Sequence, residues 1–413
     1  MFKTTPLEIS DKEIFDLIKK EDQRQLNTIR LIPSENYASS AVIEATGSSL
    51  MNKYSEGYSG KRYYEGQEFI DQIEDLAISR AKKLFNTDYH FNVQPYSGSP
   101  ANLAALFTLC NPGETIMGLE LSHGGHLTHG YKLSATGKIF KSVQYQVDKK
   151  TNLLNFEEIR KIAIENKPKV IIAGFTAYPR QFDFNEFRKI ADEVGAYLMA
   201  DISHISALVA SGVHSSPFGI ADIITSTSHK SLGGPRGAFI ACKSEFALKV
   251  DKAIIPGLQG GPHNSITAAM AVAFKEANTK EFKEYAKQII KNSKALSEEL
   301  IKLGYQLITN GSDNHLILID MIKSKNIPGK IISSALIKAN IECNANTVPF
   351  DERGPMNPSG IRLGTPAVTT IGMKENDMRD VALFINEAIE NYDDEFELEK
   401  IKENVIDFMK KFN

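Results

Sequence analysis

Residues 226–237, S-T-S-H-K-S-L-G-G-P-R-G, decide how the fold of this chain is interpreted. They continue an apolar, strand-like run at 220–227 and end in a glycine-rich turn. A lysine that follows a strand is most often a surface residue. Lys230 could instead be an amine nucleophile, because a lysine amine forms Schiff bases with carbonyl compounds. The rest of the chain has to decide between these two interpretations.

Composition and charge are those of an ordinary globular protein. The 413 residues, 42% hydrophobic and 24% charged, suffice for two or three domains. The net charge of −3 argues against nucleic-acid or membrane partners. Three cysteines spaced more than a hundred residues apart predict reduced thiols. The N-terminal M-F-K-T-T-P-L-E-I-S-D-K-E lacks the apolar core of a targeting peptide, and no apolar run reaches the ~18 residues of a membrane span. We therefore expect a soluble, cytoplasmic protein.

Short apolar runs alternate with helical segments through the middle of the chain. The predicted strands are 89–93, 115–118, 138–143, 169–174, 197–201, 220–227 and 237–241. The predicted helices between and around them are 70–85, 100–109, 156–166 and 185–194. This alternation predicts a mostly parallel, seven-stranded sheet covered by helices on both faces. Ligands bind such sheets at the carboxyl ends of the strands, and Lys230 follows one of those ends.

The N-terminal and C-terminal parts of the chain do not share this alternation of strands and helices. The motif S-D-K-E at 10–13 predicts a capping box that opens a helix. The helical pattern at 266–303 is long enough to bridge two domains. A smaller α+β unit follows, with strands near 305–309, 315–320 and 361–364 and a helix at 328–339. We expect an N-terminal helical arm at 1–50, a large domain at 51–280 and a small C-terminal domain at 281–413.

Pyridoxal phosphate (PLP) is the cofactor that a lysine commonly holds, and its site needs further groups. A carboxylate must face the pyridine nitrogen, and Asp201, at the end of A-Y-L-M-A-D, could supply it. The following D-I-S-H would equally suit a helix N-cap. The phosphate needs a cradle of backbone N–H groups, and S-G-S at 97–99 stands between a strand and a helix. Such a turn can also be a plain N-cap.

Two further stretches could complete such a site. In H-G-G-H-L-T-H-G, 123–130, metal binding is one alternative, but no carboxylate or cysteine stands close by in the sequence. A ring stacked on a planar cofactor is favoured, with His126 as the candidate. Arg362, in S-G-I-R-L-G-T-P, could bind a substrate carboxylate with two parallel hydrogen bonds, or it could be a surface arginine.

Together these stretches resemble the serine hydroxymethyltransferase family, which are PLP enzymes of fold type I. The matching segments, in order, are L-I-P-S-E-N, Y-S-E-G-Y-S-G-K-R-Y-Y-E-G, N-V-Q-P-Y-S-G-S-P-A-N, G-G-H-L-T-H-G, A-D-I-S-H-I-S-A-L-V-A-S-G-V-H, T-S-H-K-S-L-G-G-P-R-G, G-L-Q-G-G-P and S-G-I-R-L-G-T-P-A. The resemblance implies an α/β fold with a large PLP-binding domain and a smaller C-terminal α+β domain. It also implies reversible conversion of L-serine and tetrahydrofolate to glycine and 5,10-methylenetetrahydrofolate, through an external aldimine and a quinonoid.

The resemblance assigns roles to individual residues. The catalytic residues it implies are Lys230, which carries PLP, and His229, Asp201, His126, Glu56 and Tyr64. Cofactor binding falls to Ser97, Gly98, Ser99, Thr176, His204, Arg236, Tyr54, Gly260 and Gly261, besides Lys230, His126 and Asp201. Substrate binding falls to Ser34, His204 and Arg362, with Glu56 and Tyr64. Folate binding falls to Glu56, Tyr63, Leu121, Gly125, His126, Leu127, Asn346, Gly354, Pro355 and Met356. No metal is implied. Because Tyr54, Glu56, Tyr64 and Gly261 are expected from a neighbouring subunit, a homodimer is the minimum active unit, and a tetramer is possible.

Several positions depart from the family's usual pattern. Thr176 replaces a serine, and its hydroxyl could keep a cofactor hydrogen bond. Ser265 stands where a histidine is common, at the expected dimer contact. Met356 replaces a phenylalanine near the aminobenzoyl arm of the folate, a space that a flexible methionine can fill. Pro33 replaces an alanine and stiffens the approach to Ser34.

Two alternative functions compete with this interpretation. A threonine aldolase of the same fold would need no folate, but the segments Y-S-E-G-Y and G-G-H-L-T-H-G argue against it. A catalytically silent homologue would act as a scaffold, and the presence of Lys230, Asp201 and Glu56 argues against that alternative.

Overall fold

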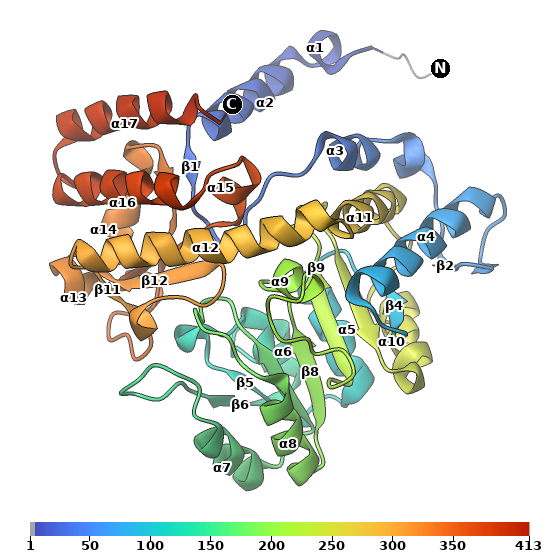
Figure 1. Cartoon of the computed structure of the whole chain (residues 1–413). Coiled ribbons are helices and arrows are strands. Elements are labelled where there is room, and N and C mark those ends of the chain that lie inside the picture. The colour runs from blue at the N-terminus through green and yellow to red at the C-terminus, as the bar shows by residue number, and fades with distance from the viewer. Residues whose placement is uncertain (1–4, 413) are drawn as a thin grey trace.

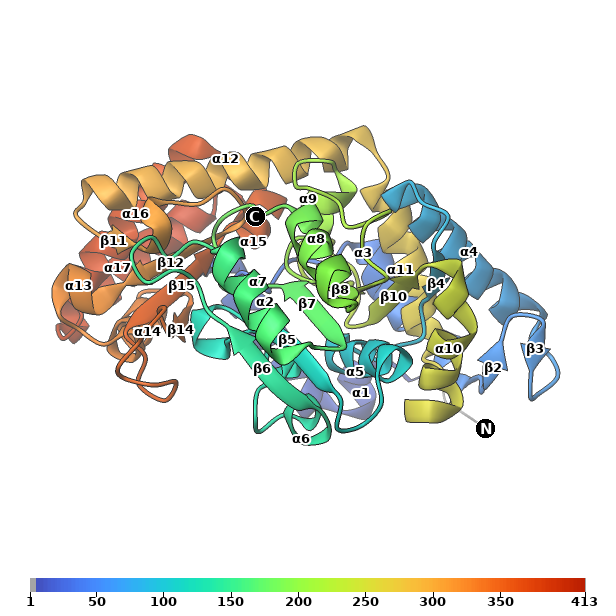
Figure 2. The ribbon, with the colours of Figure 1, turned by 90° about the horizontal axis from the view of Figure 1, so that it is seen from below.

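A seven-stranded sheet forms the centre of the larger part of the molecule. In the computed structural model, which describes residues 5–412, the strand order is β4-β10-β9-β8-β7-β5-β6. The strands are β4 (His90–Asn92), β5 (Thr115–Leu119), β6 (Lys141–Tyr145), β7 (Val170–Gly174), β8 (Tyr197–Asp201), β9 (Ile223–Thr227) and β10 (Ala238–Cys242). Strands β5 to β9 pair in parallel, and β10 pairs antiparallel with both β4 and β9. Figure 2 shows the strands following one another across the sheet. The predicted α/β class with a mostly parallel sheet is confirmed.

Helices cover both faces of this sheet, and the alternation of side chains along each strand shows why. Ile171 and Ala173 of β7 pack into one apolar cluster, with residues of α4, α7 and α8, whereas Val170 and Ile172 pack into another, with residues of α5 and α10. Both sets are fully buried, as expected for parallel strands between two helical layers. The helices of this part are α4 (Glu68–Phe85), α5 (Gly98–Leu109), α6 (Ala135–Ile139), α7 (Phe156–Asn166), α8 (Phe184–Val194), α9 (Ser206–Ala210), α10 (Ala247–Lys252) and α11 (Asn264–Ala277). The shorter turns are η2 (Leu121–His123), η3 (Leu127–His129), η4 (Ser244–Phe246) and η5 (Ala253–Leu258).

A smaller four-stranded antiparallel sheet, in the order β11-β12-β15-β14, forms a second unit. Its strands are β11 (Gln306–Leu307), β12 (Leu316–Asp320), β14 (Asn344–Asn346) and β15 (Gly360–Gly364), with the turn η6 (Ile308–Asn310). Its helices are α12 (Lys280–Lys302), α13 (Met321–Lys325), α14 (Gly329–Lys338), α15 (Pro366–Thr370), α16 (Glu375–Glu390) and α17 (Glu395–Met409). In Figure 1, α12 runs from the end of α11 along this smaller unit.

The N-terminal segment contacts both units. Strand β1 (Ile29–Arg30) pairs in parallel with β13 (Ile341–Glu342), so Ile29 lies in the core of the smaller unit. The other elements of this segment are α1 (Leu7–Ser10), α2 (Lys12–Leu26), α3 (Ser40–Thr46), η1 (Ser49–Asn52) and the hairpin of β2 (Gly57–Tyr58) and β3 (Lys61–Arg62). Helices α1 and α2 project away from the rest of the chain in Figure 1, and neither has a buried residue. The domain boundaries predicted from the sequence stay a prediction.

Three details of the predicted elements are wrong. Asp11, not Ser10, caps α2 by accepting the N–H of Ile14, because Ser10 already belongs to α1. The predicted strand 138–143 begins too early, since α6 extends to Ile139 and β6 starts after it. The single helix predicted over 266–303 is two helices, because Thr279 caps the start of α12 by accepting the N–H of Phe282.

Two expectations about the cellular setting concern features that the structure describes. Cys110, Cys242 and Cys343 carry free thiols. Within residues 5–412 no helix combines the length and the apolar character needed to span a bilayer. Residues 1–4, the start of the N-terminal stretch that lacks the apolar core of a targeting peptide, lie outside the described residues. The cytoplasmic location stays a prediction.

Candidate active site

A cavity of about 440 Å³ lies beside the carboxyl ends of β7, β8 and β9, where Thr176, Asp201 and Lys230 meet. It brings together most of the predicted site residues. Those that line it are Ser34, Ser97, Gly98, Ser99, Leu121, Gly125, His126, Leu127, Thr176, Asp201, His204, His229, Lys230, Arg236, Asn346 and Arg362. We call it the Lys230 cavity. Arg362 and Asn346 reach it from the smaller unit, so the cavity lies between the two units.

Lys230 stands three residues beyond the end of β9, in a turn that fixes its backbone. The carbonyl oxygen of Lys230 accepts the N–H of Gly233 at 3.0 Å and the side-chain amide of Asn36 at 3.1 Å. Burial lowers the pKa of the Lys230 amine to about 8. The charge of Arg362 adds to this lowering, whereas the carboxylate of Asp201 opposes it. The amine is therefore readily deprotonated, as a nucleophile must be.

Asp201, the last residue of β8, is a buried carboxylate whose oxygens both accept hydrogen bonds. Its Oδ1 accepts from the N–H of Ser203 at 3.0 Å and from the Ser203 hydroxyl at 2.6 Å. Its Oδ2 accepts from Asn102 Nδ2 at 2.8 Å and from His129 Nε2 at 3.0 Å. Burial alone would raise the pKa of this carboxyl, but the hydrogen bond from His129 and the charge of Lys230 hold it well below its usual range. The N-cap alternative is wrong, because the next helix, α9, has Ile205 at its N-cap.

Asn102 and His129 belong to this site although the sequence did not single them out. The amide of Asn102 donates to Asp201 and to Thr128 Oγ1, both at 2.8 Å, and its carbonyl oxygen accepts from the Thr225 hydroxyl. His129 Nδ1 accepts the N–H of His126, so Nε2 carries the hydrogen that Asp201 accepts. Asn102 is the last residue of the motif N-V-Q-P-Y-S-G-S-P-A-N, and His129 is the last but one of G-G-H-L-T-H-G, so membership of these motifs is the signal that could have found them.

The S-G-S turn forms the start of α5 at the floor of the cavity. The N-cap residue Ser97 makes no side-chain capping bond, so the first N–H groups of α5 are left for another acceptor. A Cβ atom on Gly98 would lie 2.8 Å from Cγ2 of Thr227, so only glycine fits there. Thr227 Oγ1 and His229 Nδ1 are buried, and neither has a hydrogen-bond partner among residues 5–412. These features suit an anion such as a phosphate.

His126 presents a neutral ring to the cavity. Burial, together with the nearby His129, lowers the pKa of His126 to about 4. Its Nδ1 accepts the N–H of Thr128 at 3.2 Å. No carboxylate is close to this histidine-rich stretch in the sequence, but the fold brings Asp201 to it, and ligand atoms of His126, His129 and Asp201 lie within 4.8 Å of one another. Two of those atoms, on His129 and Asp201, are already hydrogen-bonded to each other.

Arg362, in the middle of β15, crosses from the smaller unit to the large sheet. Its Nε donates to Asn344 Oδ1 at 3.0 Å, and its Nη1 donates to the carbonyl oxygen of Thr176. Burial lowers the pKa of Arg362 to about 10, so the guanidinium stays charged at neutral pH. The hydroxyl of Thr176 donates to the carbonyl oxygen of Gly125 at 2.9 Å, which leaves that hydroxyl able only to accept from a ligand.

His204 and His315 form a buried pair that the sequence did not predict. His204 Nδ1 lies 3.2 Å from Nε2 of His315, which directly precedes β12 in the smaller unit. Burial lowers the pKa of His204 well below the ordinary value and lowers the pKa of His315 to about 3, so both rings are neutral. His204 lines the Lys230 cavity, and this hydrogen bond therefore links the cavity to the smaller unit.

The predicted residues Tyr54, Glu56, Tyr63 and Tyr64 lie elsewhere, around the β2–β3 hairpin and outside the lining of the Lys230 cavity. The Tyr64 hydroxyl donates to Glu56 Oε2 at 2.9 Å, and the Tyr54 hydroxyl donates to Oε1 at 3.4 Å. This bond to Glu56 raises the pKa of Tyr64. The side chains are accessible, with Tyr54 60% and Tyr64 46% exposed. We call Tyr54, Glu56 and Tyr64 the Glu56 cluster.

The predicted glycines Gly260 and Gly261 pack beneath the Glu56 cluster. A Cβ atom on Gly260 would lie 3.0 Å from Glu56 Oε1, and one on Gly261 would lie 3.3 Å from the ring of Tyr54. Neither glycine lines the Lys230 cavity. One chain therefore carries two separate groups of predicted site residues.

The remaining predicted folate residues lie in the loop before β15. Met356 is 81% exposed, and Pro355 lines a second cavity of about 630 Å³ that shares Leu121 with the first. Gly354 has a φ of +75°, which glycine adopts without strain. These three residues do not line the Lys230 cavity, and their role in folate binding stays a prediction.

Comparisons with known proteins agree with this geometry. A family model described as serine hydroxymethyltransferase matches residues 7–385. The chain is 55% identical over 408 residues to a serine hydroxymethyltransferase of Desulfotalea psychrophila, covering 99% of this chain and 95% of that protein. It is 58% identical over 382 residues to one of Acidothermus cellulolyticus, covering 92% and 89% of the two chains, and 54% identical over 402 residues to one of Sorangium cellulosum, covering 97% and 95%.

The fold and the Lys230 cavity are therefore those of a PLP enzyme of fold type I. Within that class, the chain belongs to the serine hydroxymethyltransferase family.

Proposed function

We propose that the Lys230 cavity of one subunit and the Glu56 cluster of a second copy together form the active site of a serine hydroxymethyltransferase. The reaction converts L-serine and tetrahydrofolate to glycine, 5,10-methylenetetrahydrofolate and water, and it runs in both directions. One observation carries the proposal: the same cavity contains the amine of Lys230, whose pKa is lowered, and the carboxylate of Asp201, whose two oxygens both accept hydrogen bonds.

PLP fits the groups that the cavity offers. Lys230 would hold it covalently, Asp201 would face the pyridine nitrogen, and the start of α5 would hold the phosphate. The neutral ring of His126 suits stacking on the flat cofactor without adding a charge. The bound cofactor supplies an electron sink that weakens the bonds at Cα of the amino acid. Asp201 keeps its negative charge and so would stabilise a positive charge on the pyridine nitrogen of the bound cofactor.

Arg362 and Ser34 would bind the carboxylate of serine. Two of the guanidinium nitrogens, Nε and Nη1, are held by Asn344 and Thr176, which orients the group before the substrate arrives. His204 would contact the cofactor or the substrate through Nε2, because its Nδ1 is engaged by His315. His229 and Arg236 line the same cavity and would limit the size and charge of the substrate.

Glu56 would handle the proton of the substrate hydroxyl. Its two carboxylate oxygens accept from Tyr54 and Tyr64, whose side chains are exposed within one chain, and Glu56 itself is half-buried. We infer that they complete the Lys230 cavity of a partner subunit, which makes a homodimer the smallest active unit. Exposed apolar side chains near the N-terminus support such an interface: Leu7, Ile9, Ile14, Leu17, Ile18, Ile43, Met51 and Phe69. Folate would lie between the Glu56 cluster and the backbone at Leu121, Gly125 and Leu127, near Asn346.

The test is glycine formation from L-serine by the PLP-loaded enzyme, with and without tetrahydrofolate. We expect strong folate dependence, and we expect Glu56→Gln to lower the folate-dependent rate by about 10²–10⁴-fold because it removes the proton acceptor. The absorption of bound PLP should be unchanged in Glu56→Gln, since Lys230 lies in a different group of residues. Turnover of 3-hydroxy amino acids without any effect of folate would contradict the proposal and indicate an aldolase.

A further inference from the structure

The backbone that carries Glu56 is held at every peptide carbonyl from residue 53 to residue 57. The carbonyl oxygen of Glu56 accepts the N–H of Tyr63 across the hairpin at 3.1 Å. Asn264 Nδ2 donates to the carbonyl of Lys53 at 2.8 Å, and Gln67 Nε2 donates to that of Tyr54 at 3.0 Å. These three carbonyls are thus held by a side chain of α11, by the residue that precedes α4, and by the hairpin itself.

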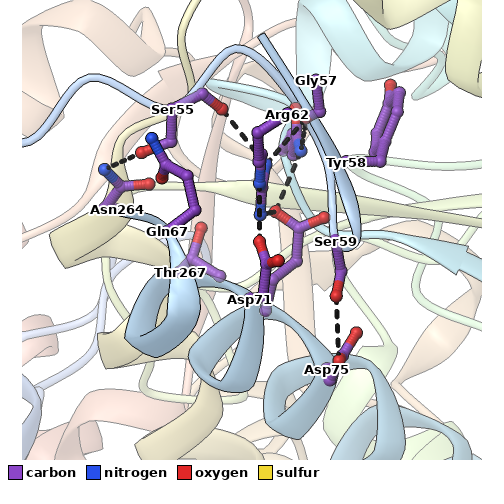
Figure 3. Close-up of polar contacts among 12 residues, drawn as sticks. Ser55, Gly57, Tyr58, Ser59, Arg62, Gln67, Asp71, Asp75, Asn264 and Thr267 are labelled. Carbon is purple, nitrogen blue, oxygen red and sulfur yellow. Dashed lines mark hydrogen bonds and ion pairs between the residues drawn. The ribbon is translucent and has the colours of Figure 1, made fainter. Parts of the chain in front are cut away.

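Arg62 holds the two carbonyls on either side of Glu56. Its Nη1 donates to the carbonyl oxygen of Ser55 at 3.1 Å and to that of Gly57 at 2.7 Å. Figure 3 shows the guanidinium between these two carbonyls and the start of α4. The side chain of Arg62 is only 3% exposed, although its neighbour Tyr63 is exposed. Because this buried arginine binds the carbonyl groups before and after Glu56, the backbone of Glu56 is fixed and only its side chain can move.

Two carboxylates of α4 hold Arg62 in place. Its Nε donates to Asp71 Oδ1 at 2.8 Å, and its Nη2 donates to Glu74 Oε2 at 2.9 Å. Gln94 Nε2 also donates to Glu74 Oε2 at 2.9 Å and to the carbonyl of Gly57 at 3.0 Å. Burial raises the pKa of Glu74 while the charge of Arg62 opposes that rise. The guanidinium is thus oriented from a helix of its own chain.

We propose that Arg62 is a positioning residue that acts through Glu56 on the active site of the partner subunit. The inference rests on the proposed function and adds a residue that touches neither substrate nor cofactor. It requires the planar fork of arginine, because a lysine ammonium can neutralise Glu74 but cannot also reach Asp71 and both carbonyls. Tyr54 and Tyr64 then align the Glu56 carboxylate on this fixed backbone.

The first experiment compares Arg62→Lys with Arg80→Lys in the PLP-loaded enzyme. Arg80 lies on α4, the helix that carries Asp71 and Glu74, and its Nη1 donates to the carbonyl of Ala271, away from the hairpin, so it is a matched control. For Arg62→Lys we expect the folate-dependent kcat to fall by about tenfold or more, with the KM for serine and the absorption of bound PLP unchanged. Arg80→Lys should alter none of these quantities. An unchanged kcat in Arg62→Lys would overturn the inference.

The second experiment identifies the subunit on which Arg62 acts. Differently tagged chains that carry Arg62→Lys and Lys230→Ala are produced together, and the hybrid dimer is purified. In the hybrid, one cavity has an intact Lys230 and faces a Glu56 cluster whose Arg62 is also intact. We expect that dimer to recover about half of the wild-type rate, although each parent dimer is impaired. A hybrid no more active than the Arg62→Lys parent would overturn the inference, because Arg62 would then act within its own chain or on folding.

Two further measurements keep these results interpretable. If Arg62→Lys does not fold, Gln94→Leu replaces it, since this variant removes another donor to the Gly57 carbonyl and leaves both ion pairs of Arg62 in place. The expected change is a smaller fall in kcat with the same recovery in the hybrid, and no fall would contradict the inference. Absence of folate-dependent activity in the wild-type enzyme would instead refute the proposed function.

Discussion

The Lys230 cavity and the Glu56 cluster differ in how deeply their functional side chains are buried. In the cavity, the functional groups are buried and oriented by neighbours in the same chain, as Asp201 is by Asn102 and His129. In the cluster, the backbone is equally well held, but Tyr54 and Tyr64 are exposed and Glu56 is only half-buried. This difference fits the proposal that one chain builds two half-sites. Binding of cofactor and amino acid would depend on the first, and transfer to folate would need both.

The variant with the largest expected effect tests the Lys230 cavity alone. Lys230→Ala removes the amine that would hold PLP, so we expect turnover to fall on the order of 10³-fold or more. The visible absorption of lysine-bound PLP should be lost after gel filtration, while the free energy of unfolding changes little or rises, because a buried amine is removed. Absorption and kcat are the measurements, and Lys243→Ala, which removes a lysine paired with Asp222, is the control. Retention of bound cofactor by Lys230→Ala would show that the covalent partner is another residue.

A second prediction concerns the pH at which PLP attaches. Because burial lowers the pKa of Lys230 to about 8, more of the amine is neutral at pH 7 than for an exposed lysine with a pKa of about 10.4, by roughly two orders of magnitude. The rate at which apoenzyme takes up PLP should rise with pH and level off near pH 8, since only the neutral amine attacks the aldehyde. Stopped-flow absorption from pH 6 to 10 measures it.

The control for this pH dependence is the reaction of PLP with a blocked lysine over the same range, which corrects for the ionisation of PLP itself. A rate that keeps rising in parallel with that of the blocked lysine up to pH 10 would contradict the lowered pKa.

The sequence predicted the parts of this molecule that depend on local pattern. The end of β8 at Asp201 and the lysine beyond β9 followed from apolar runs, and the start of α5 followed from a glycine between small hydroxyl residues. The cap of α2 was displaced by one residue because Ser10 and Asp11 are both good caps, and only the separate turn of α1 decides between them. Such choices are not encoded in a window of four residues.

Other parts of the site depend on contacts between distant segments. His129 and Asn102 meet Asp201 only because α5, η3 and β8 come together, over separations of 72 and 99 residues. His315 lies 111 residues from His204 and follows no motif that marks a site. The sequence could place Glu56 and Lys230 in one active site only through resemblance to a family, because within one chain they belong to separate groups.

The smallest expected effect concerns the link between the cavity and the smaller unit. His315→Leu would leave the buried Nδ1 of His204 without its partner, which costs about 1–3 kcal/mol. We expect the free energy of unfolding to fall by about that amount and the KM for serine to rise several-fold, because His204 would lose its fixed orientation. Urea unfolding and steady-state kinetics measure the two effects.

His315→Gln is the variant that separates orientation from packing. A glutamine amide reaches about as far as Nε2 of histidine and can donate or accept, so it should restore much of the KM lost in His315→Leu. Equal KM values in the two variants would show that the hydrogen bond does not orient His204, and that His315 matters only for packing between the units. Recovery in His315→Gln would mean that the smaller unit contributes to the cavity in two ways, by placing Arg362 in its lining and by holding the ring of His204.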